Sequence, residues 1–225
     1  MMTAQAKWAI ENSTAVCGYD KYVDQIRELI PSSAQVFTSG MKGEVERAEA
    51  SVRYAKEGHT VCLVCGGDPS LYSLASLVMQ IGDGTAEIEV IPGVTAAMAA
   101  SARLGAPISD DLAIISMSDL LTPWEVIKKR IDAVNLGDFV AAIYNPKSMK
   151  RTDQIVYALD SFYRSRGDLI IGTVKNAFRD NEQVKISTIS GFDYDFVDMT
   201  SIVMAGCTKT ILKNGRMITP RGYPI

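Results

Sequence analysis

Apolar and polar positions along the chain follow two periods, one typical of helices and one typical of strands. The helical period predicts helices over residues 3–12, 21–30, 44–57, 70–81, 95–104, 123–134 and 152–164. Short apolar runs between them predict strands over residues 14–17, 35–38, 60–65, 88–91, 112–116, 139–144 and 169–174. Because helices and strands alternate in this way, the chain is predicted to have an α/β fold.

The last part of the chain departs from this alternation. Residues 184–189 and 201–205 follow each other without a convincing helix between them, which predicts antiparallel strands. Chain-breaking and polar residues gather in the segment Gly105–Asp111, near the middle of the chain. We therefore expect two α/β domains, residues 1–107 and residues 108–225, the second with a mixed sheet.

Composition narrows the class of protein. The chain has 225 residues, of which 47% are hydrophobic and 22% charged, so it can bury one large core or two modest ones. A net charge of -3 does not favour nucleic-acid binding through bulk basicity. Residues 1–12 carry lysine, glutamate and glutamine and do not resemble a signal peptide, and the sequence has no run of about 18 apolar residues. A cytoplasmic protein that does not cross a membrane and keeps its cysteines reduced is expected.

The most informative segment is a strand-to-helix turn after the apolar run 60–65. The sequence Gly66-Gly67-Asp68-Pro69 ends the predicted strand and opens the next helix. The glycines allow a ligand to approach the backbone, and Asp68 can cap the helix or accept a hydrogen bond from a ligand. A tight turn with a capped helix explains the same residues without any ligand. The motif has neither the ending of a phosphate-binding P-loop nor the spacing of a dinucleotide site.

A second glycine turn, Ile91-Pro-Gly-Val-Thr-Ala-Ala97, follows the next apolar run. If both runs are strands of one parallel sheet, both turns fall on its carboxyl edge. Together, Gly-Gly-Asp-Pro-x-x-Tyr and Pro-Gly-Val-Thr-Ala resemble the cofactor-binding core of the tetrapyrrole methylases, which are class III methyltransferases. In that family S-adenosylmethionine lies in a cleft between two α/β domains.

Two further segments make the resemblance more specific. Residues 114–125 and 142–148 resemble the branch of the family that methylates carbon 17 of precorrin-3B or of its cobalt counterpart, cobalt-precorrin-3. The resemblance implies an S-adenosylmethionine-dependent C-methyltransferase of cobalamin biosynthesis, which contracts the ring of a small-molecule tetrapyrrole and releases S-adenosylhomocysteine. It also implies a homodimer and no metal bound by the protein. The sequence does not decide whether the substrate already carries cobalt.

The resemblance also implies which residues contact the cofactor. Carried over to this chain, the family pattern gives Gly66, Gly67, Asp68, Leu71, Thr95, Ala96, Tyr144, Asn145 and Ala177. Backbone groups at the small residues can bond the cofactor, and Leu71 can supply an apolar wall. For Thr95 to Ala97, helix capping with small-residue packing is the alternative interpretation.

Candidates for catalysis and for substrate binding lie in the second half of the chain. Ser118 and Asp119 could give acid-base or electrostatic help to the ring contraction, although a solvated aspartate that caps a turn is the simpler interpretation. Lys147, Lys150 and Arg151 form a basic cluster beside a candidate site loop, where they could pair with substrate carboxylates. A solvated helix start would explain the same three residues.

Other reactive residue types favour structural roles. Cys62 and Cys65 are three apart on a predicted strand and therefore point to opposite faces, which favours core packing over a redox or metal pair. The sequence contains one histidine, His59, so it offers no support for a histidine-rich metal site or a Ser-His-Asp triad.

The chain departs from the family at its start. Family members usually begin with a strand and a Gly-Pro-Gly-Asp-like loop, whereas residues 1–4 resemble the beginning of the helix that follows this loop. We therefore expect one of two cases: the chain is truncated, or the site is built without that loop. Two alternative functions stay open: a protein that binds S-adenosylmethionine or a tetrapyrrole without turnover, and a methylase for another precorrin position.

Overall fold

Parallel strands form the sheet of the first of two units in the computed structural model, which describes residues 1–224. The units are Met1–Thr95 and Ala96–Ile225. Within the described residues of the first unit, the sheet has three strands in the order β2-β1-β3. The strands are β1 (Ala15–Tyr19), β2 (Gln35–Ser39) and β3 (Val61–Val64). The apolar run of β1 is almost fully buried, as expected for a central parallel strand.

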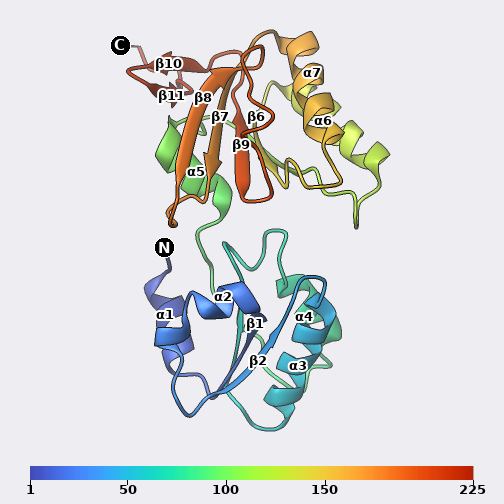
Figure 1. Cartoon of the computed structure of the whole chain (residues 1–225), viewed down its shortest axis with the longest axis vertical. Coiled ribbons are helices and arrows are strands. Elements are labelled where there is room, and N and C mark those ends of the chain that lie inside the picture. The colour runs from blue at the N-terminus through green and yellow to red at the C-terminus, as the bar shows by residue number, and fades with distance from the viewer. Residues whose placement is uncertain (225) are drawn as a thin grey trace. The chain divides into compact units, whose positions relative to one another are not determined.

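Helices cover both faces of this sheet (Figure 1). The helical elements of the first unit are α1 (Ala4–Glu11), α2 (Asp20–Asp24), the 3₁₀ helix η1 (Arg27–Leu29), α3 (Glu44–Lys56) and α4 (Ala75–Ile81). Helix α1 begins at Ala4 because the Thr3 hydroxyl accepts the Ala6 backbone N–H at 3.2 Å. Ile10 of α1 then packs with Val16, Ile26 and Val64 in a small core.

The second unit is built on a five-stranded mixed sheet, counted over its described residues, in the order β5-β6-β9-β7-β8. The strands are β5 (Leu112–Ser116), β6 (Val140–Tyr144), β7 (Ile170–Lys175), β8 (Gln183–Thr188) and β9 (Ser201–Ala205). Strand β9 runs antiparallel to both β6 and β7, and β5 is parallel to β6. Strands β5, β6 and β7 therefore point the same way and end at one edge of the sheet.

Each face of this sheet packs against a different set of helices (Figure 1). Helix α5 (Ala96–Leu104) covers one face, and α6 (Trp124–Gly137) and α7 (Asp153–Arg166) cover the other. Strand β6 shows the alternation: Val140 and Ala142 join the core under α5, while Ala141 and Ile143 join the core under α6 and α7. Two apolar cores thus hold the sheet rigidly from both sides.

A small sheet closes the second unit. Strands β10 (Ile211–Lys213) and β11 (Arg216–Ile218) form a hairpin whose turn, Asn214-Gly215, has positive φ angles of 51° and 71°. Strand β11 also pairs with β4 (Gly105–Ala106). The Gly105–Asp111 segment, where we expected the chain to divide into two domains, is therefore partly a strand of the second unit.

The division into units differs from the boundary that we predicted after residue 107. Helix α5, placed by the sequence in the first domain, belongs to the second unit. Its buried residues Ala97, Ala100 and Leu104 pack with Val174 and Met204. The apolar face of α5 therefore completes the second core, and no sequence period could show which sheet that face meets.

Most predicted elements are confirmed to within a few residues, and the strands at 112–116 and 201–205 have the predicted bounds. The antiparallel strands at the end of the chain are confirmed as well, since β8 and β9 both pair antiparallel with β7. The helix predicted over residues 21–30 is split into α2 and η1.

Two predictions between the two glycine turns are wrong. The helix predicted from Ser70 begins only at Ala75, because residues 70–74 turn and Tyr72 has a φ of 52°. The strand predicted over residues 88–91 is absent, because within residues 1–224 no neighbouring strand forms a ladder with this segment.

A glycine in β7 tests the packing between α5 and the sheet. A Cβ at Gly172 would lie 2.5 Å from both Cδ atoms of the fully buried Leu104. Gly172→Ala should therefore lower the free energy of unfolding by about 1–3 kcal/mol, measured by urea denaturation. Gly191→Ala is the control, because its Cβ would meet nothing closer than 3.9 Å. Equal stabilities of the two variants would contradict this packing.

Candidate functional site

The carboxylate of Asp68 joins the two glycine turns of the first unit. Its Oδ2 accepts the backbone N–H of Gly93 at 2.9 Å, and its Oδ1 accepts the N–H of Ser70 at 2.8 Å. The predicted approach of the two turns is therefore present. The Asp68 side chain holds the two turns together. Two adjacent strands do not, because the segment before Gly93 is not in the sheet.

The glycines at this junction are required by protein packing. A Cβ at Gly93 would lie 2.0 Å from the backbone oxygen of Gly67, and a Cβ at Gly66 would lie 2.6 Å from the ring of Tyr22. Gly67 itself has a φ of 80°. We expected Gly66 and Gly67 to let a ligand approach the backbone. At Gly66 the space that a Cβ would take is filled by the ring of Tyr22.

Hydrogen bonding keeps Asp68 ionised. The N–H of Gly93 lowers the pKa of the Asp68 carboxyl below its ordinary value, desolvation opposes this shift, and the backbone and side chain of Ser70 add to it. Asp68 does not cap helix α4, because this helix begins only at Ala75. It caps the preceding turn, in which the Leu71 N–H donates to the Asp68 backbone oxygen at 3.3 Å. Asp68 is thus an anion fixed between two loops.

In the second unit, the candidate residues gather where β5, β6 and β7 end. Asn145, directly after β6, has a φ of 49° and donates from Nδ2 to the Ser116 hydroxyl at 2.9 Å. The same hydroxyl accepts the Ser118 N–H at 3.2 Å. Ser116 therefore connects the Asn145 turn to the Ser118-Asp119 turn, a role that the sequence analysis missed. The sequence offered one signal for this role: Ser116 is the polar residue that ends the otherwise apolar strand β5.

Tyr144 holds the start of α5. Its hydroxyl accepts the Ala97 backbone N–H at 2.8 Å, so a side chain from the end of β6 satisfies a free donor of the first helical turn. The structure thus brings Tyr144 close to Ala96 and Ala97, as a shared site would require.

The basic cluster divides into three environments. Arg151 is buried, donates to the Asn145 backbone oxygen at 2.7 Å and lies 3.9 Å from Asp119. Burial lowers the pKa of its guanidinium, and Asp119 partly offsets the shift. Lys147 donates to the Tyr194 backbone oxygen at 2.7 Å, whereas Lys150 is exposed. Of the three, Lys150 is the most accessible to a dissolved substrate.

The remaining candidates occupy intermediate positions. Ser118 and Ala177 are half-buried, and Asp119 is exposed and accepts a hydrogen bond from Gln154 at 3.2 Å. Thr95 is half-buried at the end of the first unit. Each of these residues stands on a loop or at a helix start, so its backbone groups are not all consumed by regular structure.

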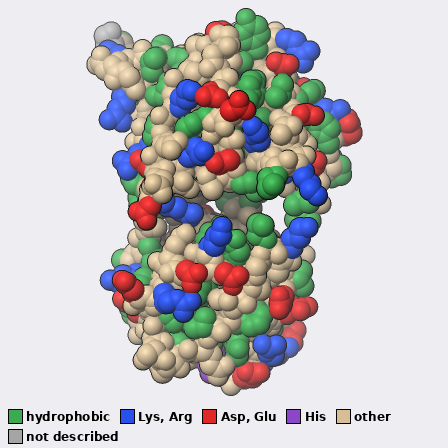
Figure 2. Space-filling view, viewed as in Figure 1, with side chains coloured by type: hydrophobic (Ala, Val, Ile, Leu, Met, Phe, Trp, Pro, Cys, Tyr) green, Lys and Arg blue, Asp and Glu red, His purple; other side chains and the backbone are tan. Residues whose placement is uncertain are grey.

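Neither a metal site nor a membrane-spanning helix is found in the part of the chain that the structure describes. Among residues 1–224, no group of three or more His, Cys, Asp or Glu side chains is arranged to hold a metal ion. Over the same residues, no helix is long and apolar enough to cross a membrane. On the face shown in Figure 2, basic and acidic side chains are intermixed over each unit.

Comparisons with known proteins agree on one family. The model of the Tetrapyrrole (Corrin/Porphyrin) Methylases matches residues 1–193. The chain is 45% identical over 99% of its length to "Cobalamin biosynthesis protein CbiHC" of Archaeoglobus fulgidus, of which it spans 50%. It is 40% identical to the "Probable cobalt-factor III C(17)-methyltransferase" of Salmonella typhimurium, with 100% of the chain and 95% of that protein covered.

A solved structure shares the fold closely. The crystal structure of "the methyltransferase CobJ" matches with a TM-score of 0.91 and 28% identity, and covers 97% of this chain and 93% of that one. The chain spans about half the length of the CbiHC relative.

The link through Asp68 predicts a local change in hydrogen exchange. In Asp68→Ala the Gly93 amide loses its acceptor, and we expect it to exchange roughly tenfold faster, measured by hydrogen–deuterium exchange. Because the folded-state pKa of Asp68 is lowered, its stabilisation is present at neutral pH and is lost as the pH falls below the ordinary value of 3.8.

Asp83→Ala is the matched control for this experiment. Asp83 caps a similar turn in the same unit, where it accepts the Thr85 N–H at 3.2 Å. Its replacement should leave the Gly93 amide unchanged, and an equal effect of both variants would refute a specific link through Asp68.

Proposed function

Because the chain belongs to the tetrapyrrole (corrin/porphyrin) methylases, we propose that it methylates carbon 17 of a corrin precursor. The substrate class is precorrin-3B or cobalt-precorrin-3, the donor is S-adenosylmethionine, and ring contraction accompanies the transfer. The Salmonella relative, matched along nearly its whole length and carrying a cobalt-factor III C(17)-methyltransferase name, supports this choice within the family. The site observation that supports it most is the anionic Asp68 held between two glycine turns.

The chemistry of Asp68 suits the proposed cofactor. The carboxylate accepts the N–H groups of Gly93 and Ser70 and a hydrogen bond from the Ser70 side chain. Because an ionised carboxylate has about four lone-pair sites, it keeps acceptor capacity for a ligand donor. The methionine part of S-adenosylmethionine carries an ammonium group and a cationic sulfur, for which an ionised carboxylate is a favourable neighbour. An aspartate with a lowered pKa stays charged throughout the neutral range.

The proposed cofactor contacts follow the loops described above. In the first unit they are Gly66, Gly67, Asp68, Leu71 and Thr95, and in the second unit Ala96, Tyr144, Asn145 and Ala177. At the glycine and alanine positions only backbone groups can form hydrogen bonds. The direction of these backbone groups therefore matters for binding. The hydrogen bonds of Asn145 with Ser116 and of Ala97 with Tyr144 fix the backbone at two of these loops.

Methyl transfer depends mainly on alignment. Bound S-adenosylmethionine supplies an electrophilic methyl group. The protein must hold donor and acceptor atoms in line, an effect that reaches about 7–11 kcal/mol in model reactions. We propose that the loops tied by Asp68 and Ser116 provide this rigidity, and that Ser118 and Asp119 assist proton transfer or charge stabilisation during ring contraction.

The basic cluster is proposed to recognise the carboxylates on the rim of the macrocycle. Lys150 is exposed and could pair directly, while Lys147 and the buried Arg151 add positive charge nearby. The homodimer and the cytoplasmic location stay predictions.

The proposed activity can be tested with the full chain. Purified protein incubated with S-adenosylmethionine and precorrin-3B or cobalt-precorrin-3 should form S-adenosylhomocysteine and a product with one added methyl group. NMR should place this methyl group on carbon 17. Binding of S-adenosylhomocysteine without turnover would favour the non-catalytic alternative, methylation elsewhere would favour another precorrin position, and absence of binding would exclude the proposal.

Charge reversal tests the substrate contact. Lys150→Glu should raise KM for the corrin precursor by about five- to tenfold at low salt, while the Kd of S-adenosylhomocysteine stays unchanged. Lys129→Glu is the control, because Lys129 is an exposed lysine of α6 that is not among the proposed site residues. If the two variants have the same KM, Lys150 does not contact the substrate.

A further inference from the structure

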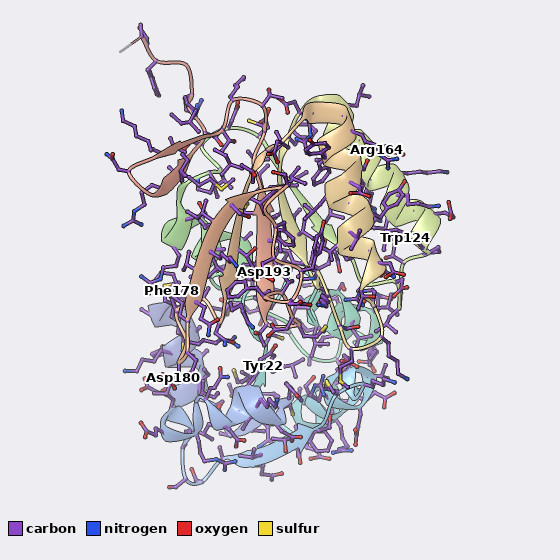
Figure 3. All side chains as sticks on the ribbon, turned by 45° about the horizontal axis from the view of Figure 1, so that its top comes forward. Tyr22, Trp124, Arg164, Phe178, Asp180 and Asp193 are labelled. Atoms are coloured by element: carbon purple, nitrogen blue, oxygen red, sulfur yellow. The ribbon has the colours of Figure 1, made fainter. Side chains whose placement is uncertain are left out.

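The loop between β7 and β8 has an unusual backbone. Over residues 176–182, Asn176, Phe178 and Asn181 have positive φ angles of 49°, 56° and 59°. Asparagine tolerates this left-handed region, but a bulky aromatic residue rarely adopts it without support from its surroundings. Figure 3 shows Phe178 and Asp180 on this loop. Ala177, a proposed cofactor contact, lies between two of the left-handed residues.

Two charged side chains supply the support. The Glu182 carboxylate accepts the Phe178 backbone N–H at 2.5 Å and the Arg103 Nε–H at 2.9 Å, both through Oε2. The Arg103 guanidinium also lies over the Phe178 ring, 3.9 Å from its centroid. One carboxylate and one guanidinium therefore hold both the backbone and the side chain of Phe178.

The charge on Glu182 favours its hydrogen bonds with Phe178 and Arg103. The Phe178 N–H lowers the pKa of the Glu182 carboxyl, and the hydrogen bond and charge of Arg103 add to the shift. The Glu182 side chain is only 21% exposed, so water competes weakly for its oxygens. At neutral pH the carboxylate is charged and both hydrogen bonds are available.

The same contacts fix the conformation of Ala177. On one side, the Asn176 N–H donates to the Thr200 backbone oxygen at 3.2 Å, and on the other, the Phe178 N–H is held by Glu182. Because alanine has only a methyl side chain, any hydrogen bond from this residue to a ligand must come from its backbone. The direction of that backbone is set by its two neighbours.

Helix α5 connects this cluster to another proposed contact. Ala96 and Ala97 begin the helix, with the Ala97 N–H bonded to Tyr144, and Arg103 stands in its last turn. A single rigid helix thus relates the backbone near Ala96 to the loop that contains Ala177.

We propose that Glu182 and Arg103 are positioning residues that hold the Ala177 turn in the shape required to bind S-adenosylmethionine. This inference rests on the proposed function. Without the carboxylate, Phe178 can relax to a negative φ, and the peptide between Ala177 and Phe178 rotates away from the binding orientation.

The test is a set of variants at Glu182. Glu182→Ala should weaken S-adenosylhomocysteine binding about tenfold in calorimetry and raise KM for S-adenosylmethionine similarly, while kcat at saturating donor stays close to wild type. Glu182→Gln keeps an acceptor for the Phe178 N–H and should recover part of the loss. Arg103→Lys keeps the charge but loses the planar stacking, so it should give a smaller loss than Glu182→Ala.

Asp180→Ala is the matched control, since Asp180 is an exposed acidic residue of the same loop and should leave binding unchanged. If wild type does not bind S-adenosylhomocysteine, the proposed function fails. If wild type binds and Glu182→Ala binds equally well, or loses kcat without a change in Kd, the positioning role is refuted. Should Glu182→Ala fail to fold by circular dichroism, Glu182→Gln and Arg103→Lys decide the question in the same way.

Discussion

The backbone contact between Gly67 and Gly93 governs the arrangement of the candidate site in the first unit. A Cβ at Gly93 would collide with the carbonyl oxygen of Gly67, whereas Gly67 is favoured by its positive φ of 80°. Van der Waals packing alone does not fix the orientation of the two segments at this contact, because it is not directional. Asp68 supplies the direction through a hydrogen bond from its carboxylate to the Gly93 N–H. This hydrogen bond matters for the 92–95 segment because, within residues 1–224, no strand ladder holds it.

The second unit uses the same physical device more than once. Ser116, Arg151 and Glu182 each bond backbone groups of loops that follow the strand ends, or bond the asparagine that begins such a loop. The two apolar cores fix the strands, and these polar side chains then fix the loops relative to the strands. A loop held in this way loses little further conformational entropy when a ligand binds.

The helices and strands could largely be read from the sequence because their periods reflect burial that is local in the chain. The failures arise where a partner is distant. Residues 88–91 have the composition of a strand, but a strand exists only with a neighbour, and the sequence cannot show that none pairs there. Helix α5 was placed in the wrong unit for the same reason, since its period reveals an apolar face and not the sheet that receives it. Glu182 was missed because its partner Arg103 lies 79 positions away, and neither residue belongs to a recognisable motif.

The glycine motifs that define the candidate region have a structural explanation of their own. Gly66 and Gly93 are explained by contacts with Tyr22 and with the Gly67 backbone, which lie within the protein itself. The glycines therefore establish how the loops pack, and they carry little information about which ligand the loops hold. That information must come from groups whose polarity the fold does not require. Asp68 retains acceptor capacity after binding its own backbone, and Lys150 stands exposed beside a buried arginine. Discrimination between a methylase and a mere binder in this family should accordingly depend on such residues and not on the glycines.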